Sequence, residues 1–180
     1  QMDYAGPGKP PEAFYNCEAD PHNLVNLLEG EMTAEQQEAL RKHRRAYEAE
    51  RRRLRDPGAI PESEMWKWVR NEGKPLRDIL LGKSDHQPNL EAAWKAADLV
   101  GRSNSAAALK LLQSADPSER YWAILALRVA GYEDRDRVVD YLDDISVVVR
   151  IEAADWLAQE GQHREVALAR LVRELAHEDW

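Results

Sequence analysis

The sequence predicts a mainly α-helical fold whose second half is a short α-solenoid of about three helical-hairpin repeats. Gly101, Gly131 and Gly161 lie 30 residues apart, and a fixed period of this length is typical of stacked repeats. The residues that align at this period are apolar and spaced by three or four, as one face of a helix requires. Each repeat within residues 89–180 is therefore expected to be a helix, a glycine turn and a second helix.

The residues that repeat at this period lie on both sides of each glycine. They are Ala93, Ala123 and Ala153 before it, and Ala108, Val138, Leu168, Leu112, Leu142 and Val172 after it. The run DPSE at residues 116–119 combines an N-cap residue, a first-turn proline and a glutamate that can bond back to the cap. Each glycine stands where a left-handed residue would end the first helix of its repeat. These end signals support the division into helix pairs.

The composition argues against several classes of function. The chain has 180 residues and a net charge of −8, which argues against a nucleic-acid or anionic-membrane partner. No apolar run reaches the roughly 18 residues of a transmembrane helix. The single cysteine excludes an internal disulfide and leaves the compartment open, and the five histidines lack the spacing of metal ligands. The sequence predicts no catalytic, cofactor-binding or metal-binding residue in this chain.

The first thirty residues contain a pattern that needs more protein than the chain supplies. Residues 13–17 include Phe14 and Tyr15 and predict a short strand, which Asp20 and Pro21 end in a turn. A single short strand is not stable alone, and no later segment provides a partner strand. The sequence therefore indicates that this part belongs to a larger domain, and residues 12–30 are expected to be poorly ordered without it.

A long helix is expected from Thr33, which begins a capping box, to about Leu54. Its apolar stripe consists of Leu40, Tyr47 and Leu54, seven positions apart, which predicts a helix that lies on a surface with one edge buried. Eight lysines or arginines and two acids lie between residues 41 and 55. The candidate anion site of this stretch, for a sulfated or phosphorylated ligand, consists of Arg44, Arg51 and Arg52. The alternative is a solvated helix face or one docked on an acidic neighbour.

Residues 57–88 are expected to form a bridge of short helices. Residues 62–70 can form one helix, and residues 74–81 another that lies on the first repeat. Trp66 and Trp68 are two positions apart and cannot share one helix face, so one is expected in the core and the other half-exposed. A ring that stacks on a sugar is the functional alternative.

The surfaces of the repeats offer a second candidate site. The second helices of stacked pairs line the usual binding face of such arrays. In the middle repeat, Asp136, Asp140 and Asp143 fall together on one side of this helix. They form a candidate acidic groove for a basic protein partner, and the alternative is a solvated helix flank.

Two further expectations concern how the repeats pack. The tryptophans of the first helices are Trp94, Trp122 and Trp156. They are interpreted as packing between repeats rather than as a ligand cage. The last helix, residues 164–176, is expected to give the array a polar outer face. The residues assigned to that face are Arg164, Arg170 and Arg173.

Three runs carry a resemblance to known families. DPSERYWAILALRVAG (residues 116–131), followed by VVDYLDD (138–144), resembles the HEAT-like repeats also found in phycobilisome lyases. FYNCEADPHNLVNLL (14–28) is similar to the terminal signature of the sulfatase family, and RDPGAIPESEM (55–65) resembles the tail of bacterial sulfatases that continue into HEAT-like repeats. The matching positions of the signature are Phe14, Tyr15, Asn16, Asp20, Pro21, Asn26 and Leu27. Cys17 and Asn23 depart from it, because leucine and glutamate are usual there.

The resemblance implies that residues 1–56 are the end of a sulfatase C-terminal subdomain, residues 57–88 a bridge and residues 89–180 a HEAT-like module. The parent reaction that it implies is hydrolysis of a sulfate ester, with calcium and formylglycine, in a periplasmic or secreted bacterial enzyme. The sulfatase pattern Cys/Ser-x-Pro-x-Arg is missing here, since Cys17 does not fit it. This chain is therefore expected to be non-catalytic by itself.

Two roles remain open for such a module. As part of a sulfatase it would brace the rest of the parent domain, form an oligomer contact or line one wall of the substrate cleft. The alternative is a free-standing HEAT-repeat scaffold that binds a protein partner. A lyase or glycosylase built on such repeats lacks a supporting acid or base in a pocket.

Overall fold

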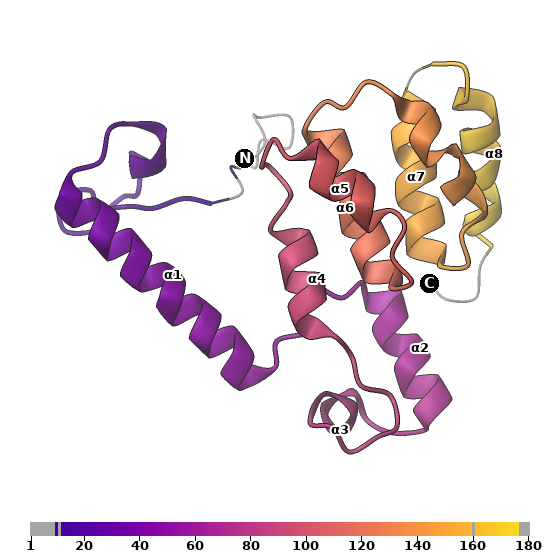
Figure 1. Cartoon of the computed structure of the whole chain (residues 1–180), viewed down its shortest axis with the longest axis horizontal. Coiled ribbons are helices and arrows are strands. Elements are labelled where there is room, and N and C mark those ends of the chain that lie inside the picture. The colour runs from indigo at the N-terminus through magenta and orange to yellow at the C-terminus, as the bar shows by residue number, and fades with distance from the viewer. Residues whose placement is uncertain (1–9, 11, 160, 177–180) are drawn as a thin grey trace. The chain divides into compact units, whose positions relative to one another are not determined.

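The computed structural model describes residue 10 and residues 12–159 and 161–176 of the chain. Every regular element within these residues is a helix, which confirms the mainly α prediction. The chain divides into two compact units, one ending at Leu54 and the other beginning at Arg55. Figure 1 shows the helices of both units.

The first unit contains a loop, the 3-10 helix η1 (Leu27–Glu29) and the long helix α1 (Ala34–Leu54). The expected capping box begins α1. The Gln36 backbone N–H donates to Thr33 Oγ1 at 3.2 Å, and the Thr33 N–H donates to Gln36 Oε1 at 2.8 Å. Two N–H groups at the start of the helix are thereby satisfied, and α1 has the limits that the sequence predicts.

The loop before α1 contains no strand at residues 13–17, so the expected short strand is wrong for the described chain. A strand needs neighbouring strands to bond its backbone groups, and side chains of the loop supply partners instead. Asn16 Oδ1 accepts the N–H groups two and three residues ahead, which is an Asx turn. Asp20 and Asn26 accept three more backbone N–H groups within residues 14–28.

The first unit buries little of its apolar surface. Phe14 of the loop packs against His43 of α1, with ring centroids 5.8 Å apart. Leu40 is the buried residue of α1. Tyr47 and Leu54, the other members of the expected stripe, are each 60% exposed. The stripe is therefore buried at one of its three positions.

The second unit is built from helix pairs. Its described helices are α2 (Glu62–Glu72), α3 (Leu76–Leu80), α4 (Leu90–Ala97), α5 (Ser105–Leu111), α6 (Pro117–Val129), η2 (Arg135–Asp143), α7 (Val147–Gln159) and α8 (Arg164–Glu174). From α4 onward they follow the predicted order of helix, glycine turn and helix. Gly101, Gly131 and Gly161 have φ angles of +76°, +67° and +96°, a left-handed conformation that favours glycine.

The second helix of each of the first two pairs packs on the first helix of the following pair. α5 packs on α6 and η2 packs on α7, whereas α8 packs on α7 of its own pair (Figure 1). The middle pair differs in that η2 is a 3-10 helix. Its sequence joins aspartates to the β-branched Val138 and Val139, and both residue types have low α-helix propensity.

Two buried clusters hold the second unit together. The larger one runs through the three helix pairs from α5 to α8. The smaller one joins Ala59 and Ile60 of the bridge to Trp94 of the first pair, with Trp68 packed against it. Trp66 is 52% exposed, whereas Trp68 is partly buried. The two tryptophans therefore differ in burial as the sequence predicts, with Trp68 at the edge of the cluster. The bridge thus folds with the repeats in one unit.

The tryptophans of the first helices serve packing, as expected. Trp94 is buried, and its indole N–H donates to the Asp56 carbonyl at 3.0 Å. The Trp122 N–H donates to the Ala59 carbonyl at 2.6 Å. Trp156 is buried in the larger cluster. These indoles tie the repeats to the bridge and to one another.

Candidate functional site

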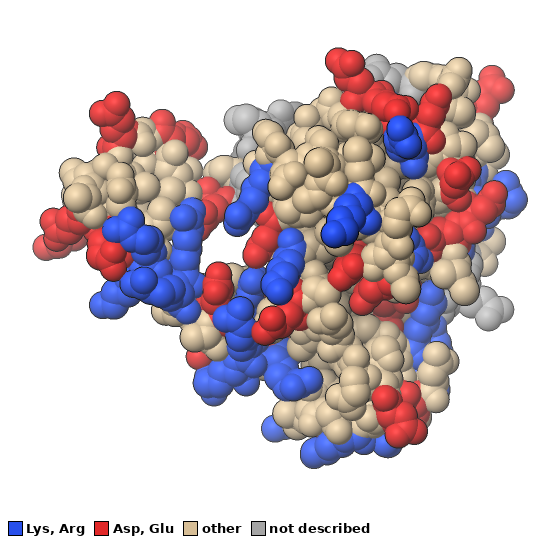
Figure 2. Space-filling view, in the orientation of Figure 1, with Lys and Arg blue, Asp and Glu red and all other residues tan. Residues whose placement is uncertain are grey.

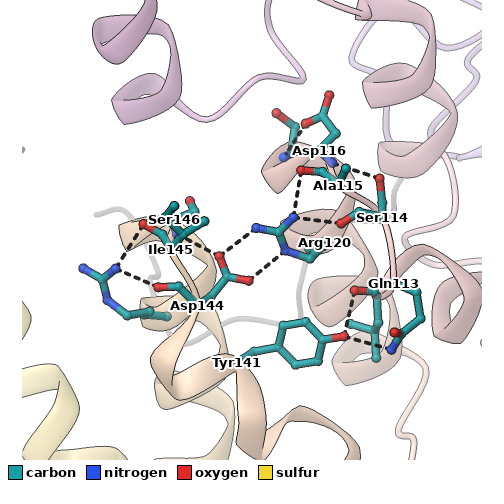
Figure 3. Close-up of polar contacts among 12 residues, drawn as sticks. Gln113, Ser114, Ala115, Asp116, Arg120, Tyr141, Asp144, Ile145 and Ser146 are labelled. Atoms are coloured by element: carbon teal, nitrogen blue, oxygen red, sulfur yellow. Dashed lines mark hydrogen bonds and ion pairs between the residues drawn. The ribbon is translucent and has the colours of Figure 1, made fainter.

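Polar groups that join the repeats recur at the period of the helix pairs. Arg120 of α6 is buried, and its Nε and Nη2 donate to the Asp144 carboxylate at 2.7 Å each. Its Nη1 donates to the carbonyls of Ser114 and Ala115 at 2.8 and 3.0 Å. These carbonyls follow α5, so one guanidinium links the end of the first pair to the end of the second (Figure 3).

The same arrangement returns one period later. Arg150 of α7 donates to the Glu174 carboxylate at 2.7 Å, and its Nη1 donates to the carbonyls of Asp144 and Ile145. Each of these residues lies 30 positions after its counterpart in the Arg120 group. The donors and acceptors of the Arg120 and Arg150 groups bond to each other within the array. We call each such group a structural tie. The charged residues align at the repeat period, and that alignment is the signal by which sequence reasoning could have found them.

A buried carboxylate joins the bridge to the third pair. Glu64 of α2 is 5% exposed. Its Oε1 accepts the hydroxyl of Ser146 at 2.6 Å and lies 3.0 Å from Lys67 Nζ. Ser146 immediately precedes α7, where unpaired backbone N–H groups favour a negative charge. No period or motif in the sequence singles out this contact.

The structure places the predicted acidic residues in three different settings. Asp136 Oδ1 lies 2.8 Å from His163 Nε2 and accepts the Gln162 side-chain amide at 3.2 Å. Asp143 pairs with Arg170 of α8. Asp140 is exposed and has no side-chain partner among the described residues. Two of the three carboxylates therefore connect the middle pair to the last pair. Asp140 is the member of the candidate groove that stays open in the described structure.

A shallow pocket of about 470 Å³ lies where the turns of the second and third pairs meet. Its lining residues are Glu133, Asp134, Arg135, Asp136, Leu157, Gly161, Gln162 and His163. Figure 2 shows acidic side chains gathered at this edge of the repeats. Among the described residues, no three His, Cys, Asp or Glu side chains converge as metal ligands. The chemistry available to the pocket is attraction of a cationic group by exposed carboxylates.

Replacing His163 by alanine is expected to raise the pKa of the Asp136 carboxyl toward its ordinary value of 3.8. In the native chain this pKa is lowered, first by the hydrogen bond with His163 and then by that from Gln162. Such a carboxyl adds stability above its unfolded pKa, and the contribution is lost as pH falls through the folded pKa.

An NMR titration of the Asp136 carboxyl carbon tests this expectation. Arg164→Ala is the matched control, because Arg164 follows His163, whereas the hydrogen bonds to Asp136 in the described structure come from Gln162 and His163. The midpoint should rise in His163→Ala and stay at the native value in Arg164→Ala. An identical midpoint in all three proteins would contradict the assignment of His163.

The candidate anion site on α1 is not assembled as one cluster. Arg44 forms a two-bond pair with Glu12. The Arg51 guanidinium lies over the Tyr47 ring, 5.2 Å from its centroid. Arg52 Nη1 lies 3.6 Å from a Glu48 carboxylate oxygen. The three arginines contact different neighbours, so the anion site stays a prediction.

In comparisons with known proteins, no family model, no curated protein and no solved structure matches this chain. Among the residues that the structure describes, no helix has both the length and the apolar character needed to cross a membrane. The functional assignment therefore rests on the residues and their geometry.

Proposed function

We propose that this chain is the C-terminal portion of a sulfatase, a sulfuric ester hydrolase, and that it is non-catalytic by itself. In this proposal the first unit completes the parent domain and the second is a HEAT-like module that braces it. The observation that carries the proposal is how little apolar surface the first unit buries. A unit this small that buries Leu40 but leaves Tyr47 and Leu54 exposed needs another surface to be stable.

The exposed apolar residues of the loop support the same view. Leu24 and Val25 are 80% and 62% exposed, and they lie inside the run that resembles the sulfatase signature. Asn16, Asp20 and Asn26 of that run are the side chains that bond the loop backbone. The matching positions thus have a physical role, which is to fold a turn that presents apolar side chains to a neighbouring domain.

The bracing role is supported by how the second unit uses its polar groups. Arg120 and Arg150 direct their donors into the array, and Glu64 ties the bridge to it. In this proposal the three pairs joined in this way are a HEAT-like solenoid that is connected to the bridge. A stiff module that follows a subdomain without a core of its own is suited to holding that subdomain in place.

The calcium and formylglycine of sulfatases would belong to the catalytic part of the parent. In this proposal no residue of this chain is assigned to either group. No metal-ligand cluster occurs among the described residues, and the exposed Cys17 bonds to Asn23 rather than standing in a basic site. No catalytic step is therefore assigned to this chain.

The reading frame upstream of Gln1 provides the direct test. A frame that continues and encodes Cys/Ser-x-Pro-x-Arg together with acidic metal ligands is the expected result. The full-length protein should then hydrolyse an aryl sulfate, and the present chain alone should not. A frame that opens near Gln1 without that pattern would exclude the sulfatase. It would leave the alternative of a free-standing HEAT-repeat scaffold, which the exposed carboxylates around Asp136 favour.

Separating the two units is expected to give opposite results. Residues 55–180 contain both buried clusters and should unfold cooperatively in urea. The described part of residues 1–54 contains one buried helical residue, and this unit should lack a cooperative transition, because too little apolar area is buried to offset the conformational entropy. Circular dichroism during urea titration measures both. A cooperative transition for residues 1–54 would contradict the proposal that this unit needs a parent domain.

A further inference from the structure

Lysines and arginines that follow one another directly occur in one element of the chain, the helix α1. The sequence has three such runs, residues 41–42, 44–45 and 51–53, and all three lie within α1. The longest run ends one residue before the helix does. Figure 2 shows basic side chains at the surface of α1. Successive arginines at a surface fit an endoprotease whose neighbouring subsites carry carboxylates, because a guanidinium pairs with a carboxylate through two hydrogen bonds.

The C-terminal end of α1 is held by few contacts. Leu40 is buried, and the next buried residue along this fully described stretch is Ala59. Helices in proteins are stabilised mainly by the packing of an apolar face, so the turns of α1 beyond Leu40 have little packing to stabilise them. Arg53 pairs with Glu50 of the preceding turn, and exposed pairs of this kind add little stability. Local unwinding of the last turns is therefore expected to be frequent.

The two earlier basic runs of α1 are tied to other parts of the first unit. Arg44 forms its two-bond pair with Glu12, which lies 32 residues earlier in the chain. Glu38 accepts hydrogen bonds from both Arg41 and Arg45, so it bridges two turns of the helix. These contacts must break before either run can extend in the cleft of a protease. The third run needs only the end of the helix to unwind.

We propose that the end of α1 is a processing site for a serine endoprotease that recognises successive arginines, and that this protease cuts between Arg53 and Leu54. Water hydrolyses the peptide bond. Its oxygen becomes part of the Arg53 carboxylate, and its two protons convert the Leu54 nitrogen into an ammonium group. The bond after Arg55 is less suited, because a protease binds its substrate extended. Arg55 has a left-handed φ of +52°, and the Asp56 carbonyl accepts the Trp94 indole N–H.

The larger product of this cut keeps the structure of the second unit. Residues 54–180 contain both buried clusters and the Arg120 and Arg150 ties. Cleavage in the second unit would require these clusters to open first, and opening a packed core costs far more than fraying a helix end. The proposal is independent of the assignment to a sulfatase, because it rests on α1 alone.

Limited proteolysis of the folded 180-residue chain, followed by mass spectrometry, tests the proposal. Kexin, a serine endoprotease that requires paired basic residues, should give residues 1–53 and 54–180 as its first products. Arg52→Gln combined with Arg53→Gln should abolish these products. Arg44→Gln combined with Arg45→Gln is the matched control, because the side chains of this pair are 51% and 69% exposed and those of the cleaved pair 49% and 68%. The control variant should give the native products.

Hydrogen exchange of the native chain tests the local unwinding without a protease. The amides of residues 51–54 should exchange faster than those of residues 40–44 in the same helix, because unwinding at the end must precede cleavage. Equal exchange at the two places would overturn the proposal. So would a native chain that kexin leaves intact or first cuts at another bond, or the same products from the variant that lacks Arg52 and Arg53.

Discussion

Replacing Arg120 by alanine is expected to lower the free energy of unfolding of the second unit by about 3–5 kcal/mol. The change leaves the Asp144 carboxylate without its cation, although the Asp144 side chain is only 7% exposed. It also removes the donor to the carbonyls of Ser114 and Ala115. A buried charge that loses its partner keeps its desolvation cost without the compensating attraction. Urea denaturation of the whole chain, followed by circular dichroism, measures the loss.

The control for this change is Arg137→Ala. Arg137 pairs with Asp134 on the surface, where both side chains are exposed, and its loss should cost at most about 1 kcal/mol. The double variant Arg120→Met with Asp144→Leu should recover part of the stability lost in Arg120→Ala, because no uncompensated charge remains. If Arg120→Ala and Arg137→Ala cost the same, the Arg120 tie contributes no more than a surface pair.

Replacing Trp94 by alanine is expected to cost about 3–5 kcal/mol, the range for removing a large buried aromatic side chain. The indole lies between the first helix pair and the bridge, and its N–H satisfies the Asp56 carbonyl. The cavity should weaken the attachment of α2 as well as the stability of α4. Hydrogen exchange measured on both helices separates this result from a general loss of stability.

Trp66→Ala is the matched control, because Trp66 is a half-exposed tryptophan of the same bridge. Among the described residues its indole bonds to Glu62, one turn earlier in α2, and the change should stay within about 0.5 kcal/mol. Trp94→Phe keeps most of the ring volume and isolates the hydrogen bond to Asp56, which is worth about 1 kcal/mol. Equal losses in Trp94→Ala and Trp66→Ala would mean that the bridge does not depend on Trp94.

The helix pairs could be predicted from the sequence because their signals are local and repeated. The glycines with positive φ, the Asp116 cap and the Thr33 capping box each act within a few residues. Residues that align at the repeat period, such as Ala123 and Ala153, are both buried because the same packing recurs at each period. Local chemistry and periodicity therefore agree for most of the second unit.

Contacts between distant residues were harder to predict. The expected strand at residues 13–17 is wrong because β-propensity cannot form a ladder without neighbours. The sequence predicts Asp136, Asp140 and Asp143 on one face of an α-helix, whereas η2 is a 3-10 helix whose Asp136 and Asp143 reach the last pair. Glu64 and Ser146 are 82 residues apart in the sequence, and only the folded array brings them together.

The recurring arginine tie makes the array extendable by gene duplication. Arg120 and Asp144 are 24 residues apart, as are Arg150 and Glu174, and each arginine reaches the carbonyls five and six positions before it. All of these separations are shorter than the 30-residue period. Copying one period in frame therefore reproduces both halves of the tie together with the apolar columns. A lengthened array would therefore have the same interface between its new repeats, whereas an insertion between the arginine and its acid that is not a whole number of periods would separate the two residues.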